Sequence, residues 1–509
     1  MPSLNRSRKP ADGSPRPRVV IVGGGFGGLY AARGLARAPV DVTVIDKVNY
    51  HLFRPMLYEV ATGLLSADEI AAPIRSILRK QKNADVLMEE VVGVDTERRI
   101  VRTREGGVPY DYLILATGIK YNYFGHDEWK RVAPGLDTVD DADHIRGKIL
   151  TAFEEAERLT AAASPSRDIV DWGEPPGPAG NRSARQSEDP DPDRDPIKPL
   201  LTFVLVGGGT AGVEMAGTIA EMARMALARD FRHIDPRSAH IILFEAGPRI
   251  LPTYPENLAA KARSHLESLG VDIRAGVKVE SVDDQGVIAN GERILSRTVL
   301  WSAGVTASGA GKWIGAETDR SGRVRVGADL SVPGHSNIFA IGDTALVTAY
   351  SRNILGLRSK AAEPLPGVAQ PAIQGGEYVA SVIKARVTGK AAPKPFWYWD
   401  KGSLAVVGRT FAIADLNVMK FWGFPAWAIW IGVHIFFLIG FANRILVMFQ
   451  WSISFLTKRR GVRIFPMDER TPAPVEEPAS DSRGQAASES DSQRAATPGR
   501  RRASGADSR

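Results

Sequence analysis

Two stretches of the sequence decide the fold: residues 18–28 read RVVIVGGGFGG, and residues 202–212 read TFVLVGGGTAG. In each stretch a short, apolar, β-branched run, typical of a buried strand, leads into a glycine-rich turn and then into a helical pattern. A further apolar strand follows each helix and ends in an acidic residue, Asp46 in the first copy and Glu245 in the second. Two copies of this unit predict an α/β protein with two Rossmann-like dinucleotide-binding domains.

The glycines of each copy follow the G-x-G-x-x-G spacing. The first glycine permits the tight turn, the second lets a pyrophosphate approach the backbone, and the third lets helix and strand pack closely. The phosphates then lie at the helix N-terminus, where free N–H groups favour anions. A glycine turn without a ligand is the alternative, and its repetition in the same context makes it a poor one. The glycines concerned are Gly23, Gly25 and Gly28 in the first copy and Gly207, Gly209 and Gly212 in the second.

The two strand-end acids are candidates for nucleotide recognition. Asp46 and Glu245 stand where the dinucleotide fingerprint has a carboxylate that accepts hydrogen bonds from an adenosine ribose. A carboxylate at Glu245 would repel a 2′-phosphate, so NADH is expected in preference to NADPH. The alternative for each acid is a solvated carboxylate at a strand end.

The 509 residues contain no cysteine, which excludes disulfide bonds, iron–sulfur clusters, thiolate zinc sites and cysteine redox relays. Only eight histidines are present, scattered along the chain. Redox chemistry is therefore expected to use a bound organic cofactor, and no metal site is predicted. The net charge of +7 is mild, requires no nucleic-acid partner, and suits an acidic membrane surface equally well.

A third stretch indicates which copy binds which nucleotide. Residues 337–343 read NIFAIGD, a strand that ends in Gly342 and Asp343. It resembles the second FAD signature of flavoproteins with two dinucleotide-binding domains, in which the aspartate contacts the ribityl chain. Two further stretches resemble the linker signatures of that superfamily: Ala116, Thr117 and Gly118 in one, and residues 301–304, which end in Gly304, in the other.

This resemblance implies that the first glycine loop binds FAD and the second binds NADH as substrate. No His or Cys stands in a recognisable attachment context, so we expect the FAD to be non-covalent.

Within that superfamily the chain resembles the type II NADH:quinone oxidoreductases, single-subunit respiratory enzymes that do not pump protons, and is most similar to actinobacterial members. The resemblance covers roughly residues 18–463, except the insertion described below. It implies electron transfer from NADH to a membrane quinone. The family usually has Gln where Arg54 stands, which leaves the role of this side chain open; the neighbouring Pro55 fits the family's FAD-binding motif. The stretches that carry the resemblance are 50–63 (YHLFRPMLYEVATG), 206–217 (VGGGTAGVEMAG), 367–376 (GVAQPAIQGG) and 400–405 (DKGSLA).

The third of these stretches looks like the quinone-site motif of the family. A helix is expected after Pro366 and Gly367 and through about Ala385, with its N-terminus towards the flavin, which makes Ala369 a cofactor-binding candidate. Gln370 and Gln374 are four residues apart, on one helix face, where they can hydrogen-bond a quinone carbonyl. Without the family context, a pair of glutamines on a solvated face would be the better interpretation.

Two charged residues complete the expected catalytic set. Lys401 could stabilise negative charge on a reduced quinone or flavin, although taken alone it is better read as a surface lysine. Glu214 lies in the first turn of the second nucleotide helix, where any glutamate benefits from the helix dipole; by resemblance it approaches the nicotinamide. The residues show no unambiguous proton donor to the quinone.

The C-terminal region contains two uncharged apolar stretches, 421–443 and 445–457. The first is long enough for a transmembrane helix, whereas tryptophans at 422, 427, 430 and 451 suit an interfacial location. By resemblance we favour a pair of helices that lie on the cytoplasmic face of the cell membrane, with lipids and quinone as partners; a homodimer is left open. Basic residues placed to bind anionic lipid are Lys420, Arg444, Lys458, Arg459, Arg460 and Arg463.

Composition and motifs together predict the domain organisation. Segments rich in Pro, Ser, Asp, Gly or Arg cannot bury a core and are expected to be disordered. The expected segments are a disordered tail over 1–17, the first part of the FAD-binding domain over 18–163, a disordered insertion over 164–199, the NADH-binding domain over 200–300, the second part of the FAD-binding domain over 301–395, a membrane-associating region over 396–463, and a disordered tail over 464–509.

Two other functions use the same nucleotide domains. A soluble NAD(P)H reductase of a protein electron carrier would need no apolar C-terminal region. A membrane-tethered nucleotide-binding sensor would show no turnover, so steady NADH oxidation with added quinone distinguishes it. Sulfide:quinone and disulfide reductases share the fold but use cysteines, which this chain lacks.

Overall fold

The computed structural model describes residues 15–163, 195–439 and 441–457. All of them belong to the unit Met1–Pro466, and the description below concerns that unit. The tails expected over 1–17 and 464–509 and the insertion expected over 164–199 lie outside the described residues, apart from residues 15–17 and 195–199. Residues 195–199 form part of an ordered turn that leads into the second nucleotide domain.

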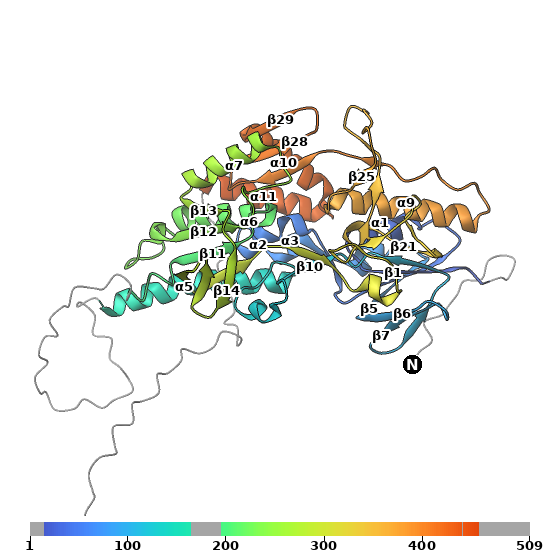
Figure 1. The fold of residues 1–509 in the computed structure, drawn as a ribbon, viewed down its shortest axis with the longest axis horizontal. Helices are drawn as coiled ribbons and strands as arrows, with labels where there is room; N and C mark the ends of the chain where they lie inside the picture. Colours follow the sequence, from blue (N-terminus) through green and yellow to red (C-terminus); the bar gives the residue numbers. More distant parts are fainter. Residues whose placement is uncertain (1–14, 164–194, 440, 458–509) are drawn as a thin grey trace, which may run out of the picture. The chain divides into compact units, whose positions relative to one another are not determined.

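The first nucleotide domain is built on a six-stranded sheet with strand β1 near its centre (Figure 1). Val19 and Val20 point to opposite faces of β1, and both are buried, as a strand covered on both faces requires. Strand β21 comes from far along the chain and pairs in parallel with β9, so two separate segments of the sequence form this one sheet. In spatial order the strands are β20 (Ser331–Val332), β21 (His335–Ala340), β9 (Tyr112–Leu115), β1 (Arg18–Val22), β2 (Asp41–Asp46) and β5 (Ala84–Met88).

Helices α1 (Phe26–Gly34) and α9 (Ala369–Val387) pack against each other beside this sheet (Figure 1). Their close approach depends on glycine. A Cβ on Gly376 would overlap the carbonyl oxygen of Gly27, and a Cβ on Gly34 would lie 2.6 Å from the Cβ of Ala380. The glycines thereby fix α9, the helix of the expected quinone motif, directly on the helix that starts at the first glycine loop.

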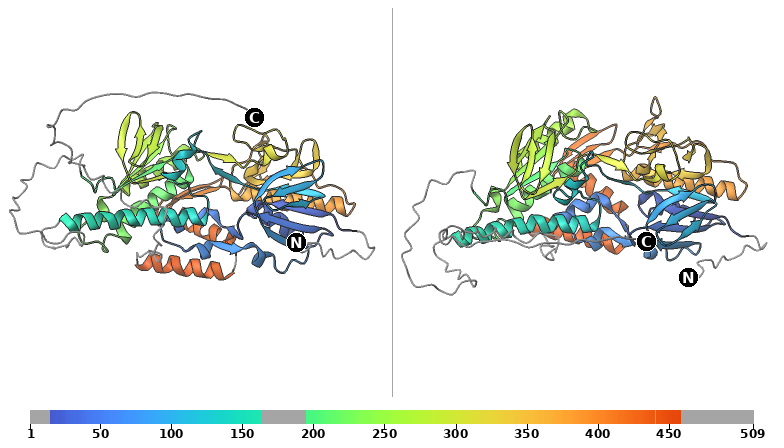
Figure 2. Two further views of the ribbon diagram at one scale, coloured as in Figure 1. Left: turned by 90° about the horizontal axis from the view of Figure 1, so that it is seen from below. Right: turned by 60° about the horizontal axis from the view of Figure 1, so that its bottom comes forward.

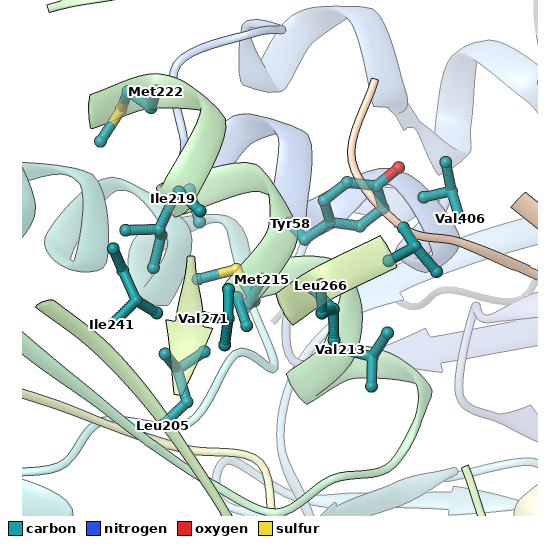
Figure 3. Packing of buried hydrophobic residues seen from close by; sticks show 14 of the residues in the cluster. Tyr58, Leu205, Val213, Met215, Ile219, Met222, Ile241, Leu266, Val271 and Val406 are labelled. Atoms are coloured by element: carbon teal, nitrogen blue, oxygen red, sulfur yellow. The ribbon is translucent and has the colours of Figure 1, made fainter. Parts of the chain in front are cut away.

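The second nucleotide domain repeats the plan with a four-stranded parallel sheet. Helix α6 (Thr210–Glu221) lies on this sheet and continues as a π-helical turn over Met222–Ala226. Figure 3 shows Met215 and Ile219 of α6 on the side of the sheet residues, with Tyr58 and Val406 on the other side of the helix. The strands in spatial order are β13 (Val271–Ala275), β12 (His240–Glu245), β11 (Thr202–Val206) and β17 (Thr298–Trp301).

The two domains are joined by two chain crossings that pair with each other. Strand β10 (Ile119–Tyr121) leaves the first domain and strand β18 (Val305–Ala307) returns to it, and the two are antiparallel. Each follows one of the expected linker signatures directly. The crossings therefore bring the signatures together, as the resemblance to two-domain flavoproteins implies.

The C-terminal region consists of a three-stranded antiparallel sheet followed by two helices, coloured orange-red in Figure 2. The sheet contains β27 (Ser403–Val406), β28 (Ala412–Asp415) and β29 (Lys420–Gly423), and the helices are α10 (Phe424–Phe437) and α11 (Phe441–Thr457). The backbone becomes extended at Leu438. The residues 421–443 thus form a strand, a helix and the start of a second helix rather than one long helix.

None of the helices in the described part of the chain combines the length and the hydrophobicity that a membrane crossing needs. Over 421–443, where one transmembrane helix was the alternative, the described elements are β29, α10 and the start of α11. The physical reason is local: Phe421 and Trp422 pair with β28, so the helix cannot begin before Phe424.

The other elements are short or lie at the periphery. The helices are α2 (Leu57–Ala61), α3 (Ala67–Ile70), α4 (Ile74–Leu78), α5 (Val139–Ala163), α7 (Glu256–Ser268) and α8 (Ala310–Trp313), with 3₁₀ turns at Arg54–Met56, Asp127–Arg131, Pro236–Ser238 and Gly342–Thr344. The strands are β3 (Tyr50–Leu52), β4 (Ala71–Pro73), β6 (Val91–Asp95), β7 (Ile100–Thr103), β8 (Gly107–Pro109), β14 (Val279–Asp283), β15 (Gly286–Ala289), β16 (Glu292–Leu295), β19 (Val324–Arg325), β22 (Ala345–Leu346), β23 (Thr348–Ala349), β24 (Ser351–Arg352), β25 (Glu363–Pro364) and β26 (Tyr398–Trp399).

Candidate functional site

The first and third glycines of both loops are required by the backbone. Gly23 and Gly207 have φ values of +105° and +111°, in the region that favours glycine. A Cβ on Gly23 would overlap the carbonyl of Ala116, and one on Gly207 would lie 2.6 Å from the backbone of Ser302 and Ala303. The third glycines, Gly28 and Gly212, lie directly against the carbonyl oxygens of Gly23 and Gly207.

The second glycines differ from these in a way that fits a ligand. A Cβ on Gly25 or on Gly209 would meet nothing within 4 Å. Each also caps the N-terminus of its helix, α1 or α6. Both loops therefore expose backbone at a helix N-terminus, the geometry in which a pyrophosphate binds.

The strand-end acids hold the glycine loops. Asp46 accepts hydrogen bonds from the N–H of Gly24 (2.6 Å) and of Val48 (3.0 Å). Glu245 accepts equivalent bonds from Gly208 (2.7 Å) and Gly247 (2.6 Å). Burial raises the pKa of the Asp46 carboxyl, and the N–H of Gly24 opposes this shift. Both acids thus lie beside their loops; their bonds to a ribose remain predictions.

His51, a residue that the sequence reasoning did not select, is hydrogen-bonded to the first glycine loop. It is buried, and its Nδ1 lies 2.9 Å from the carbonyl oxygen of Gly24. Burial lowers the pKa of its ring to about 4, so the ring is neutral near pH 7 and Nδ1–H donates to that carbonyl. The sequence signal was its place in the 50–63 stretch.

The linker signatures and the second FAD signature meet in a small hydroxyl cluster. The Thr117 hydroxyl hydrogen-bonds that of Ser308, and the Thr344 hydroxyl lies 3.2 Å from the Thr117 hydroxyl. Thr344 also accepts from the N–H of Gly118 at 3.0 Å. Thr344 and Ser308 were missed at the sequence level because single hydroxyls carry no spacing signal.

The turn at Gly342 and Asp343 lies against the start of α9. Gly342 has a φ of +61°, and a Cβ on it would lie 2.9 Å from the Cβ of Ala372. A Cβ on Gly367 would lie 3.2 Å from a carboxylate oxygen of Asp343. Burial raises the pKa of Asp343, and the positive charge of Arg54 opposes the shift. The candidate FAD and quinone motifs are therefore contiguous.

Arg54, where the chain departs from the family pattern, forms an ion pair with Asp137. Its neighbour Pro55 lies at the start of the 3₁₀ turn Arg54–Met56, a position that needs no backbone N–H. The structure thus gives Arg54 a partner in the segment that precedes α5.

The two candidate glutamines of α9 differ in their contacts. Gln374 binds the backbone of Trp399 twice: its Nε2 donates to the carbonyl oxygen (3.0 Å), and its Oε1 accepts from the N–H (2.9 Å). The Oε1 of Gln370 is buried and has no hydrogen-bond partner among the described residues. The geometry therefore favours Gln370 over Gln374 as a ligand-binding side chain.

Lys401 lies between two aromatic rings. Its Nζ is 4.9 Å from the ring centre of Trp399 and 5.0 Å from that of Phe437 on α10. Burial lowers the pKa of the ammonium group. Because Gln374 holds the Trp399 backbone, it also positions the segment that carries Lys401.

Glu214 is almost completely buried on α6, with 8% of its surface exposed. Burial raises the pKa of the Glu214 carboxyl well above the ordinary value, and the charge of Glu59 raises it further. A long hydrogen bond of 3.4 Å from the Val406 N–H acts in the opposite direction. The Glu214 carboxyl therefore holds its proton more tightly than an exposed glutamate does. Glu59 was missed at the sequence level, although a glutamate within the apolar run 56–61 is an unusual occupant of a buried helix.

Comparison with known proteins agrees with this geometry. A family model described as pyridine nucleotide-disulphide oxidoreductase matches residues 17–376, and one described as NDH2 C-terminal domain matches residues 400–460. The chain is 43% identical to the type II NADH:quinone oxidoreductase Ndh of Mycobacterium tuberculosis over 88% of its own length and 89% of the relative's. It is 28% identical to the type II NADH:quinone oxidoreductase of Staphylococcus haemolyticus over 77% and 88% of the two chains.

Two solved structures show the same fold. NDH2 from Plasmodium falciparum in complex with NADH has a TM-score of 0.70 and 20% identity, over 87% of this chain and 99% of that one. The sulfide:quinone oxidoreductase of Aquifex aeolicus has a TM-score of 0.60 and 17% identity, over 91% and 100%.

Proposed function

Because the chain belongs to the type II NADH:quinone oxidoreductases, and so transfers electrons from NADH to a quinone, we propose that its flavin is a non-covalent FAD in the first nucleotide domain and that it works at a membrane surface. The observation that carries the cofactor assignment is the cradle at the first glycine loop. There Gly25 leaves open space at a helix N-terminus, and Asp46 and the Gly342–Asp343 turn belong to the same domain.

The residues around this cradle fit an FAD molecule. The glycine loop and the N-terminus of α1 would hold the pyrophosphate, Asp46 the ribose, and Asp343 the ribityl chain. The N-terminus of α9, which begins at Ala369 beside Asp343, supplies positive dipole charge. A bound FAD would accept a hydride from NADH and pass two electrons onward.

The quinone is proposed to bind beside α9. Gln370 supports this with a buried oxygen that lacks a partner in the described part of the chain, and its amide can present a donor or an acceptor to a quinone carbonyl. Lys401 would place a positive charge near the reduced quinone, in an apolar setting between Trp399 and Phe437. Gln374 acts through the backbone of Trp399.

The membrane assignment rests on exposed apolar side chains of the C-terminal region. A soluble surface rarely gathers so many large apolar groups, and the basic residues Lys420 and Arg444 lie among them along the chain. We propose that α10 and α11 lie in the cytoplasmic membrane surface. The exposed side chains are Met419, Trp422, Phe424, Val433, Phe436, Ile445, Leu446, Met448 and Phe449.

One experiment tests the cofactor and the route of the electrons. Purified protein is kept without oxygen, its flavin absorbance is bleached with NADH, and menaquinone or ubiquinone analogues are then added. We expect NADH to bleach the flavin and a quinone to restore it, and we expect denaturation to release FAD into the supernatant. Flavin that precipitates with the chain, or a released flavin other than FAD, would contradict the cofactor assignment.

A further inference from the structure

Phe124 has a backbone conformation that aromatic residues rarely adopt. It follows strand β10, the crossing from the first nucleotide domain to the second, and its φ is +55°. A bulky side chain in this left-handed region is strained. Strain of this kind persists only where the surrounding structure enforces it, and it is concentrated at functional sites.

The residues before Phe124 are anchored on Trp301, the last residue of β17, and these contacts enforce the conformation. The Trp301 indole N–H donates to the carbonyl oxygen of Asn122 at 3.1 Å, and the Tyr123 ring stacks on the Trp301 ring with 5.2 Å between their centres. The Asn122 side chain accepts a hydrogen bond of 2.8 Å from the Phe124 N–H. The backbone is therefore fixed up to Phe124, and its ring is directed outwards.

Burial of the ring offsets little of this strain, because Phe124 is 62% exposed. The ring lies on Gly304, where a Cβ would be only 2.5 Å from the end of the ring. It meets the Trp301 ring edge-on, with 6.4 Å between the centres. The ring is thus held against the linker signature on one side, and most of its surface is accessible.

The linker signature connects this ring with the second glycine loop. The backbone of Ser302 and Ala303 lies directly against Gly207. The Ser302 hydroxyl is 2.9 Å from the carbonyl oxygens of both Val206 and Gly207. Residues 302–304 therefore form the side of the loop that follows β17, and the Phe124 ring extends this side outwards.

The strand order places the two halves of a dinucleotide on opposite sides of the second loop. Strand β11, which leads into the loop, lies between β12 and β17. Glu245 at the end of β12 is the candidate for the adenosine ribose, so the adenosine half belongs on the β12 side. With the pyrophosphate at the N-terminus of α6, the nicotinamide half is directed to the β17 side, where Phe124 lies.

We propose that Phe124 is an NADH-binding residue whose exposed ring packs against the nicotinamide of NADH. Two flat aromatic rings attract each other in offset-stacked or edge-on arrangements. A ring that the backbone already holds in position also loses little freedom when the ligand binds. The inference rests on the expected placement of NADH at the second glycine loop, and it assigns to Phe124 the orientation of the ring that donates the hydride.

Phe124→Gly removes the ring and also the strain, because glycine adopts a positive φ freely. In anaerobic stopped-flow experiments, the NADH concentration that gives half the maximal rate of flavin bleaching should rise about threefold to thirtyfold in this variant. Reoxidation of the reduced flavin by quinone should keep the wild-type rate. Phe124→Tyr, which retains an aromatic ring, should bind NADH like wild type.

Two inhibitors identify the half of the dinucleotide that the ring contacts. NAD⁺ and ADP-ribose differ only in the nicotinamide, and both are measured as competitors of NADH. In Phe124→Gly the inhibition constant of NAD⁺ should rise by about the same factor as that of NADH binding, whereas the constant of ADP-ribose should stay at the wild-type value. The matched control Arg99→Gly removes an exposed side chain at another φ of +55°, in the turn between β6 and β7, and should change neither constant.

Equal weakening of NAD⁺ and ADP-ribose, or no weakening of either, would overturn the proposal. If Phe124→Gly does not fold, Phe124→Leu decides by the same comparison: it keeps an apolar group on Gly304 but should still weaken NAD⁺ and not ADP-ribose.

Gly209→Val tests the placement of NADH on which the inference rests. Its side chain would enter the open space at the N-terminus of α6, where the pyrophosphate is expected. Weaker NADH binding in Gly209→Val together with normal binding in Phe124→Gly would refute the role of Phe124 alone. Normal NADH binding in Gly209→Val would refute the placement of NADH at the second loop, and the inference with it.

Discussion

At the residue scale, Gln370 and Gln374 differ in their hydrogen-bond partners. The Gln370 oxygen is buried without a partner in the described part of the chain, whereas both polar atoms of Gln374 bind Trp399. Gln370→Leu should slow flavin reoxidation by quinone about tenfold to a hundredfold, because a hydrogen bond worth about 1–3 kcal/mol to the reacting quinone is lost. Bleaching by NADH without quinone should stay within a few-fold of wild type.

Gln374→Leu is the matched comparison. It leaves two backbone groups of Trp399 without their bonds, so it should lower the free energy of unfolding by about 1–3 kcal/mol. Stopped-flow absorbance and thermal unfolding measure the two effects. If the flavin of Gln370→Leu is reduced slowly by NADH but is reoxidised by quinone at the normal rate, the NADH side and the quinone side of the flavin have been assigned in reverse.

Glu245 should set the choice between NADH and NADPH. Its carboxylate is held at the second glycine loop by the N–H groups of Gly208 and Gly247, where a 2′-phosphate would meet a like charge. Glu245→Arg should move the NADH:NADPH ratio of kcat/KM towards NADPH by about tenfold or more. Glu245→Gln, which removes only the charge, should give a smaller change. An unchanged ratio in the arginine variant would show that another residue sets the preference.

At the scale of elements, Glu157 joins α5 to the loop after the π-helical turn. Burial acts to raise its pKa but is outweighed by bonds from the His233 side chain and from the N–H groups of Arg232, His233 and Ile234, which hold the pKa at about 2. A folded-state pKa below the unfolded value of 4.5 stabilises the fold above that value, and the stabilisation is lost as pH falls from 4.5 towards 2.

Glu157→Gln should therefore lower the thermal midpoint at pH 7, by about 2–4 °C for each kcal/mol lost. The difference from wild type should narrow as the pH is lowered below about 4.5, because the wild-type carboxylate is then being protonated. Unfolding followed by circular dichroism across this pH range checks the result. A difference that stays constant down to about pH 3 would rule out the carboxylate as its cause.

The crossing of α1 and α9 gives a second test at this scale. Gly376→Ala places a Cβ against the carbonyl oxygen of Gly27, so the helices must separate. We expect a loss of about 1–3 kcal/mol in the free energy of unfolding, together with weaker retention of FAD because α9 and the first glycine loop move apart. Gly106→Ala, whose Cβ would meet nothing within 4 Å, is the control. Equal stability of the two variants would show that the crossing tolerates a methyl group.

At the scale of the whole molecule, the surface of α11 is the proposed contact with the membrane. Ile445 and Phe449, four residues apart on this helix, are 51% and 64% exposed. The double variant Ile445→Glu/Phe449→Glu should reduce co-flotation with anionic lipid vesicles strongly, because buried carboxylates are costly in the apolar part of a bilayer. NADH oxidation with a water-soluble quinone analogue should remain.

Leu355→Glu is the control for this variant, since Leu355 is also a large apolar residue, is 67% exposed, and belongs to the turn after β24 and not to the C-terminal helices. It should float with vesicles like wild type. Equal flotation of the α11 variant and wild type would place the membrane contact on another surface.

Features that depend on neighbours along the chain could be predicted from the sequence. Strand, glycine turn and helix follow one another within a dozen residues, and the positive φ of Gly23 and Gly207 is a local property of the backbone. The nucleotide loops, the acids at the following strand ends and the start of α9 near Ala369 were therefore all predictable. The bounds of the helices come from the structure: α1 begins at Phe26, and α6 ends at Glu221, where a π-helical turn follows.

The contacts between side chains that are distant in the sequence could be seen only in the folded protein. Trp451 donates to Glu59 across 392 positions of the chain, a contact that no spacing could reveal. Helical periodicity placed Gln370 and Gln374 on one face of the helix. It could not tell which of the two would be bound by a neighbouring strand, and in the structure Gln374 binds the backbone of Trp399. This is because the packing of α2, α6, α9 and the C-terminal helices brings the partners in the core together. Glu214 becomes buried, and its pKa is raised, only when these elements have packed.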